Sequence, residues 1–302
     1  MPVRLLLGLA LLTLAPAAAA QDGRAARPAS HAASRTILFV GNSFTFGANS
    51  PVRNYRADTV TDLTNRGIGG VPALFKRFTV EAGLDYRVSL ETEPGKGLNW
   101  HWDNRRALLD RAWDDVVLQD ASVLNFADHG NPSLLIDYSG RFARMFAARN
   151  PRVRIGLTAT WSRPDMIYRG SGKWFGQPIA RMALDLRAAY DQAKAKTREI
   201  ARVHPVGQAF NCAMQTGLAD PNPYDGLSYG QVDLWSYDHY HGSAAGYYLE
   251  ALTIFVDVTG KDPRALGGRE QAAVDLGLSP DHAARLQAVA WHVATSGGRC
   301  WR

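Results

Sequence analysis

The sequence predicts an α/β protein, in which three layers (α/β/α) enclose a central, mostly parallel sheet of five strands. Three observations predict this fold. Short β-prone runs alternate with stretches of helical pattern along residues 35–302. These runs are continuously apolar, which is typical of strands that helices cover on both faces. No second linker and no internal repeat follows residue 34, so we expect a single domain over 35–302.

Each predicted element follows from its pattern. The strands are expected at 36–40, 86–90, 115–119 and 153–158, with a weaker one at 203–210. The helices are expected at 71–82, 104–112, 134–148, 180–202, 244–258 and 281–294. Gly260 stands where a glycine would end the helix 244–258. Ligands of such sheets bind at the carboxyl ends of the strands, so residues directly after each strand are the candidates for a functional site.

Composition excludes several classes of protein. The chain has 302 residues, of which 46% are hydrophobic and 21% charged, as in globular proteins rather than disordered or fibrous ones. The formal net charge is +6. The basic residues are scattered and form no run, so no nucleic-acid partner is predicted.

The N-terminus predicts export. Arg4 precedes the apolar run 5–14, and small residues follow up to Ala20. This is the pattern of a signal peptide over 1–20, with a flexible linker over 21–34. The run is shorter than the about 20 apolar residues that cross a bilayer, although an uncleaved anchor is the alternative. We therefore expect a periplasmic or extracellular protein that is not inserted in a membrane after cleavage.

Cysteine usage agrees with an oxidising compartment. The two cysteines are Cys212 and Cys300, and an even pair in an exported chain suggests one disulfide. It would tie the C-terminal tail to a loop after the region around Val206. Two free thiols are the alternative, and neither cysteine has zinc-type spacing.

A candidate nucleophile follows the first strand. In Gly41-Asn42-Ser43, a glycine that permits a sharp turn stands close to a serine just beyond a buried strand. The G-x-S-x-G pattern is absent because Thr45 occupies the position of the last glycine. A serine in this place could equally cap a helix.

A candidate base lies near the C-terminus. Asp238 stands three residues before His241, which lets a carboxylate fold back onto the imidazole ring and fix its tautomer. A rigid helix is expected directly after His241. The competing interpretation is a zinc site that includes His239, but no other cluster supplies the remaining ligands. No metal is therefore predicted, and a purely structural role for these residues stays open.

Two further strand ends carry glycines and amides. Gly97 lies in a Gly-rich segment after the second strand, where a backbone N–H could face a substrate. Gln119 ends the third strand, and its amide could donate into a site or simply satisfy loop backbone. Neither segment matches a phosphate-binding or dinucleotide-binding pattern.

Taken together, these motifs resemble those of the SGNH (GDSL-type) hydrolase superfamily, in particular a bacterial, secreted branch of it. Gly41-Asn42-Ser43 is similar to its first block, with Asn42 in place of the usual acid, and Gly97 matches its second block. Asp238 and His241 match its last block, Asp-x-x-His. The resemblance implies a flavodoxin-like fold and a serine esterase with a Ser43, His241 and Asp238 triad.

The family's third block, Gly-x-Asn-Asp, is missing from this sequence. The resemblance implies an oxyanion hole built from the N–H groups of Ser43 and Gly97 and one side chain, which Gln119 is expected to supply. Weaker candidates are Asn99, Ser122 and Asn125. Losing one such donor typically costs about 10²–10³ in rate.

The resemblance also implies a substrate class. It requires no metal or organic cofactor and suggests a small-molecule or carbohydrate ester, such as O-acyl groups on cell-envelope glycans. Trp100, Trp102 and Trp161 follow strand ends and could stack on a sugar ring, although tryptophans more often belong to the core. A lipid ester is the next candidate. A catalytically silent glycan-binding protein and a metal-dependent hydrolase remain alternatives.

Overall fold

The computed structural model describes residues 1–3 and 34–301. The predicted signal peptide, 1–20, and the predicted linker, 21–34, lie outside the described residues, except for residues 1–3 and 34. Within the described part, no helix is long and apolar enough to cross a bilayer.

Among the described residues, six parallel strands form one sheet, in the order β2-β3-β1-β4-β5-β6. They are β1 (Arg35–Gly41), β2 (Thr61–Asp62), β3 (Tyr86–Thr92), β4 (Asp115–Leu118), β5 (Arg154–Thr158) and β6 (Ile200–His204). The sequence predicts a parallel sheet of five strands, and the structure corrects the number to six. The additional strand, β2, is a two-residue edge strand that pairs with β3, and it is too short to leave a hydrophobic pattern.

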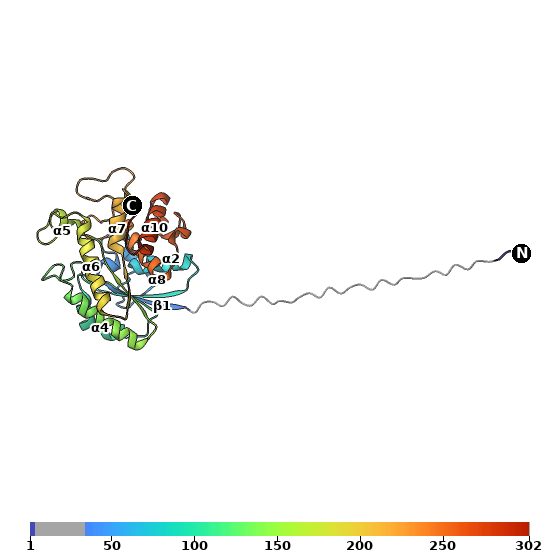
Figure 1. The fold of residues 1–302 in the computed structure, drawn as a ribbon, viewed down its shortest axis with the longest axis horizontal. Coiled ribbons are helices and arrows are strands. Elements are labelled where there is room, and N and C mark those ends of the chain that lie inside the picture. Colours follow the sequence, from blue (N-terminus) through green and yellow to red (C-terminus); the bar gives the residue numbers. More distant parts are fainter. Residues whose placement is uncertain (4–33, 302) are drawn as a thin grey trace. The chain divides into compact units, whose positions relative to one another are not determined.

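Helices cover both faces of the sheet, which confirms the predicted three-layer architecture (Figure 1). The helices are α1 (Ser43–Phe46), α2 (Gly70–Glu81), α3 (Leu98–Leu109), α4 (Ser133–Arg149), α5 (Pro164–Tyr168), α6 (Ala180–Lys196), α7 (Val206–Gln215), α8 (Ala244–Thr259), α9 (Gln271–Asp275) and α10 (Pro280–Thr295). Three short 3₁₀ segments lie at Pro51–Asn54, Ala57–Thr59 and Pro263–Leu266.

Alternate residues of the strands supply the two cores. Ile37 and Phe39 of β1 pack with α2, α7, α8 and α10, whereas Leu38 and Val40 pack with α3, α4 and α6. Side chains of a strand alternate between its two faces, so a strand covered on both sides must be apolar throughout. This requirement explains the continuous apolar runs of the sequence.

The weakest predicted strand, 203–210, is wrong from residue 205 onward, and only residues 203 and 204 belong to a strand. The strand β6 ends at His204, and Val206 begins helix α7. Pro205 separates the two elements, because it has no N–H to donate to a neighbouring strand and its φ suits a helix start. The helix predicted at 180–202 correspondingly ends at Lys196, before β6.

A disulfide joins Cys212 to Cys300, as the even cysteine count predicts. Cys212 lies within helix α7 rather than in a loop. The bond therefore fastens the segment that follows α10 to a buried helix, and it closes a loop across a sequence separation of 88 residues.

We expect removal of this bond to cost substantial stability. A closed loop of this length restricts the unfolded chain, which corresponds to about 4.6 kcal/mol in the chain-entropy model. Urea unfolding of a Cys212→Ser, Cys300→Ser double variant should show this loss against the oxidised protein. An unchanged free energy of unfolding would contradict the prediction.

Candidate active site

The loops that follow β1, β3 and β4 meet at one edge of the sheet. Gly41, the last residue of β1, pairs in register with Thr92, the last residue of β3. The backbone N–H of Gln119, directly after β4, donates to the carbonyl oxygen of Val40 at 2.9 Å. The parallel register therefore brings the segments containing Ser43, Gly97 and Gln119 to the same place.

Ser43 begins the short helix α1, and Asn42 is its N-cap. The turn requires glycine at position 41, because a Cβ there would lie 2.2 Å from Thr45 Oγ1. Ser43 is 7% exposed, at the surface of an otherwise buried turn. The hydroxyl of Tyr247, on α8, lies 3.2 Å from the carbonyl oxygen of Ser43 and holds the turn from below.

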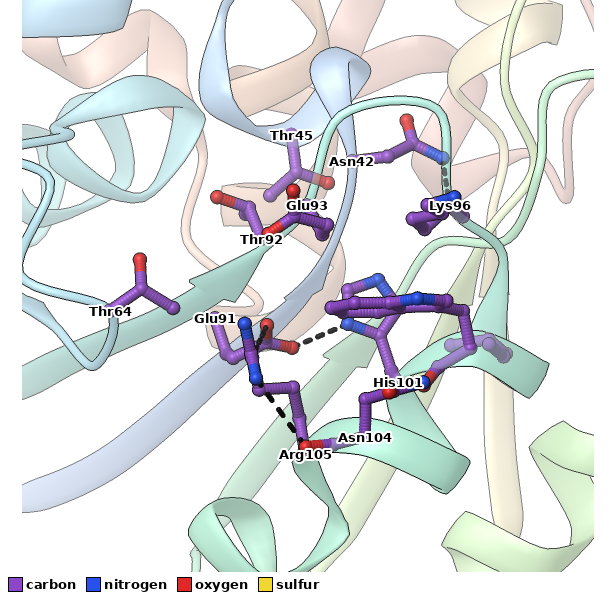
Figure 2. Close-up of polar contacts among 12 residues, drawn as sticks. Asn42, Thr45, Thr64, Glu91, Thr92, Glu93, Lys96, His101, Asn104 and Arg105 are labelled. Carbon is purple, nitrogen blue, oxygen red and sulfur yellow. Dashed lines mark hydrogen bonds and ion pairs between the residues drawn. The ribbon is translucent and has the colours of Figure 1, made fainter.

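The Asn42 side chain connects three loops. Its Nδ2 donates to the carbonyl oxygens of Lys96, at 2.8 Å, and Asp120, at 3.3 Å (Figure 2 shows the first bond). Its Oδ1 accepts from the backbone N–H of Phe44 at 3.2 Å. An aspartate could accept the last bond but could not donate the first two. This explains why the chain carries an amide here.

Asp238 folds back onto His241. Its Oδ2 lies 2.6 Å from the Nδ1 atom of His241, and its Oδ1 accepts the backbone N–H of the same residue at 3.0 Å. Burial raises the pKa of Asp238, but hydrogen bonds from the His241 ring and from the N–H groups of His241 and Tyr240 outweigh it, so the pKa is lowered overall. The carboxylate is therefore ionised at neutral pH and can hold the ring in one orientation.

Asn49 joins this pair to the loop that follows Ser43. Its Nδ2 donates to Asp238 Oδ2 at 2.7 Å, and its carbonyl oxygen accepts from Ser236 Oγ at 2.6 Å. Asn49 has a positive φ of 58°, a conformation that asparagine tolerates better than most residues. No sequence pattern predicts this residue, because its contact with Asp238 spans 189 positions of the chain.

The residue after Ser43 contacts His241. The Phe44 ring packs against the His241 ring with 5.6 Å between their centroids. The Nε2 atom of His241 is buried and has no hydrogen-bond partner among the described residues, the serine hydroxyl included. In enzymes without substrate, such contacts are often long and tighten only in the complex.

The backbone N–H groups of Ser43 and Gly97 donate to no other group in the described part of the chain. Gly97 is the N-cap of α3, and a Cβ at this position would lie 2.5 Å from Asp120 Oδ1. Close approach, rather than a special φ, therefore requires glycine. Unpaired N–H groups of this kind can stabilise a developing negative charge.

Comparison with known proteins identifies the fold. A protein of the DUF4886 family from Bacteroides uniformis has a TM-score of 0.64 and 17% identity, and the match covers 89% of this chain and 97% of the other. A GDSL-like lipase, so described, from Parabacteroides merdae has a TM-score of 0.52 and 16% identity, with coverages of 75% and 96%. The chain has the SGNH hydrolase fold.

LAE5, an α/β hydrolase enzyme from the metagenome of Lake Arreo, is also similar to this SGNH-fold chain. Its TM-score is 0.50 and its identity 16%, and the match covers 76% of this chain and 96% of LAE5. No family model matches the sequence, and no curated protein is similar to it. The resemblance that the motifs predict is thus confirmed for the fold.

The Gln119 side chain is hydrogen-bonded within the turn that carries Ser43. Its Oε1 accepts from the backbone N–H of Asn42, at 3.0 Å, and from Thr45 Oγ1, at 3.1 Å. Its Nε2 donates to the carbonyl oxygen of Asp120. The side chain is 1% exposed and supports the Ser43 turn of this SGNH fold. The structure thus gives Gln119 a supporting part in this turn, and its proposed part in an oxyanion hole stays a prediction.

The three tryptophans lie in different environments. Trp161 is completely buried, stacked on Phe210 with 4.7 Å between ring centroids, so its rings cannot contact a substrate. Trp102 is half-buried and packs edge-on against Phe142 of α4. Trp100 is also half-buried, and its backbone N–H donates to the carbonyl oxygen of Gly97 at 3.0 Å.

A buried histidine–carboxylate contact that the sequence does not predict lies beside the start of α3. His101 Nδ1 lies 2.5 Å from Glu91 Oε2, and both side chains are completely buried (Figure 2). Arg105 approaches the other carboxylate oxygen at 3.6 Å. A pairing of a strand residue with a helix residue ten positions later leaves no recognisable pattern. His239, part of the alternative zinc site, belongs to no group of metal-ligating side chains among the described residues.

Asp120 is a second buried acid. Its Oδ1 accepts the backbone N–H of Leu98 at 2.8 Å, and its Oδ2 has no partner among the described residues. Burial raises the pKa of Asp120 to about 6, although hydrogen bonds from the N–H groups of Leu98 and Ala121 and the charge of His101 lower it. The group is therefore ionised at neutral pH at a cost to the folded state.

We expect Asn42→Asp to destabilise the protein by about 1–3 kcal/mol, because two donors are lost and a carboxylate faces two carbonyl oxygens. Urea unfolding measures this loss. Asn104→Asp is the matched control, because the Asn104 amide also donates to a carbonyl oxygen but is exposed. Its effect should stay below about 0.5 kcal/mol. Equal losses in both variants would contradict the role given to Asn42.

The raised pKa of Asp120 predicts a pH-dependent stability. Below pH 4 the acid is protonated in both states, whereas between pH 4 and 6 the unfolded state ionises first. The contribution of Asp120 to stability is therefore lost as pH rises to about 6. Asp120→Asn, which keeps the acceptor for Leu98, should gain about 3 kcal/mol relative to wild type between pH 4 and 7. The measurement is the free energy of unfolding of both proteins at each pH. A difference between variant and wild type that stays constant from pH 4 to 7 would refute the prediction.

Proposed function

We propose that the protein is an exported serine esterase that hydrolyses carboxylic esters, with Ser43 as nucleophile, His241 as base and Asp238 as the residue that orients the base. The observation that carries this proposal is the Asp238–His241 pair, held by Asn49 against the loop that follows Ser43. The SGNH hydrolase fold, with Ser43 directly after its first strand, supports the assignment.

The proposed reaction has two steps. Ser43 Oγ attacks the ester carbonyl carbon while its proton passes to His241 Nε2, and the carbonyl electron pair moves onto the oxygen. When this intermediate collapses, the bond to the alcohol breaks and His241 returns the proton to the leaving oxygen. Water then attacks the acyl-serine in the same way, with His241 again as base, and releases the acid.

The local electrostatics support each role. The lowered pKa of Asp238 keeps this carboxylate charged, which stabilises the imidazolium that forms at His241 during both steps. The free N–H groups of Ser43 and Gly97 would bind the oxyanion. No metal or organic cofactor is required by this chemistry.

We propose O-acyl groups, such as acetyl, on carbohydrate or cell-envelope molecules as substrates. Trp100 lies beside Gly97 and offers a ring on which a sugar could stack. The disulfide suits an oxidising location, such as the periplasm or the extracellular space, where such substrates occur. The protein would bind such a soluble ester without itself being inserted in a membrane.

Substitution of the triad tests the esterase directly. We expect Ser43→Ala and His241→Ala to abolish hydrolysis of p-nitrophenyl acetate. Asp238→Asn should lower kcat by about 10²–10⁴, because the ring loses the acceptor that fixes its tautomer. A chelator should leave the wild-type rate unchanged.

The outcomes separate the candidate functions. Full activity in Ser43→Ala would refute the serine mechanism, and loss of activity with chelator would favour a metal-dependent hydrolase. A wild-type protein that hydrolyses no ester and does not react with an organophosphonate at Ser43, yet binds glycans, would be a silent glycan-binding protein.

A further inference from the structure

The Gln119 side chain, which is expected to supply the side-chain donor of the proposed oxyanion hole, accepts two hydrogen bonds within the Ser43 turn and donates to the carbonyl oxygen of Asp120. We therefore consider a second residue for this role. The loop after β4 continues from Gln119 through Ala121 to Ser122. A Cβ added to Gly97 would lie 3.6 Å from the Cβ of Ala121, so this loop passes directly beside Gly97. Asn42 binds the same loop at the carbonyl oxygen of Asp120. Ser122 therefore follows a segment in contact with both sides of the proposed hole.

Arg163 reaches this loop from the end of β5. Its guanidinium lies over the Tyr240 ring at 3.5 Å from the centroid, and the Tyr240 ring lies 4.0 Å from the His241 ring. Asp165 binds the Nε and Nη2 atoms of Arg163 at 3.1 and 2.6 Å. These contacts fix the plane of the guanidinium and leave Nη1 directed elsewhere.

Nη1 of Arg163 donates to Ser122 Oγ at 3.4 Å. Ser122 is 2% exposed, and its hydroxyl donates to no group in the described residues. A hydroxyl has one proton to donate and two lone pairs. Because Arg163 occupies a lone pair, the proton of Ser122 remains available for another acceptor.

We propose that Ser122 is the side-chain donor of the oxyanion hole and that Arg163 is the residue that positions and polarises it. This inference rests on the proposed esterase function. The Ser122 hydroxyl donates to the carbonyl oxygen as negative charge develops there, beside the N–H groups of Ser43 and Gly97. A donor whose oxygen accepts from a cation is a stronger donor, because hydrogen bonds in series polarise one another.

Charge also favours this arrangement over a neutral amide. The positive guanidinium lies behind the hydroxyl, in a site where low polarity strengthens electrostatic interactions. Asp165 partly balances this charge and keeps Arg163 from reaching the substrate as a free cation. Ser122 is thus proposed as a catalytic residue and Arg163 as a positioning residue.

Steady-state kinetics of purified variants with p-nitrophenyl acetate test the proposal. We expect Ser122→Ala to lower kcat by about 10²–10³ with little change in KM, because the contact forms mainly in the transition state. Arg163→Met, which keeps the packing on Tyr240, should lower kcat by a smaller factor. The double variant should be no slower than Ser122→Ala, because Arg163 acts through Ser122.

Two further measurements distinguish catalysis from structure. Ser139→Ala is the matched control, because Ser139 is a completely buried serine of α4 whose hydroxyl has no hydrogen-bond partner among the described residues. It should keep the wild-type rate. An arylboronic acid, which forms a tetrahedral anion on Ser43, should bind Ser122→Ala more weakly in proportion to the loss of kcat/KM.

The results have separate meanings. Wild-type kcat in Ser122→Ala, with turnover still dependent on Ser43, would overturn the role of Ser122 and leave the esterase standing. Additive losses in the double variant would overturn the role of Arg163. A wild-type protein without Ser43-dependent turnover would instead refute the proposed function on which this inference rests.

Discussion

The Asn42 amide is the interaction on which the arrangement of the site depends. One side chain bonds to the loops after β1, β3 and β4, and it does so at a buried position where no water can replace a lost partner. The strands alone fix only where each loop begins. Asn42 fixes how far apart the loops lie a few residues beyond the strand ends, and this spacing sets the distance between Ser43 and the N–H of Gly97. Position 42 requires an amide, because the side chain must both donate and accept hydrogen bonds.

The interior beneath these loops combines aromatic packing with costly buried acids. Trp161 lies between Phe44 and Phe210 and donates from Nε1 to the carbonyl oxygen of Tyr240, so one ring supports the loops of both Ser43 and His241. Asp120 is buried at a cost to stability, and the Glu91–His101 pair is completely buried beside it in the same loop region. Asp120 retains a function that offsets this cost, because it binds the first N–H of α3 and sets the approach of Gly97. Aromatic rings therefore fix the base side of the site, whereas polar groups fix the oxyanion side.

Much of this architecture could be predicted from the sequence, for physical reasons. Strands buried on both faces must be apolar throughout, so the sequence shows where they lie. The carboxyl ends of parallel strands meet at one edge of the sheet, and the loops that carry Ser43 and Gly97 both begin there. The contact between Asp238 and His241 is local, so spacing alone predicts it, although its part in a reaction remains a proposal. Gln119 shows the limit of such prediction, because its place at the end of a strand could be predicted, whereas its hydrogen bonds depend on Asn42 and Thr45. Pro205 is different, because a proline is itself a local signal that ends a strand, and it predicts the boundary between β6 and α7.

The disulfide has a consequence for how the domain opens. The covalent ring from Cys212 to Cys300 contains α8 and α10 and the segment that carries His241. Opening from a chain terminus is ordinarily the local unfolding event of lowest free energy. With the bond intact, the end of α10 is attached to buried α7, so fraying cannot progress inward along α10 to α8. Slow hydrogen exchange in these two helices then depends on the oxidation state of two sulfur atoms, and the redox condition of the surroundings decides which part of the domain opens first.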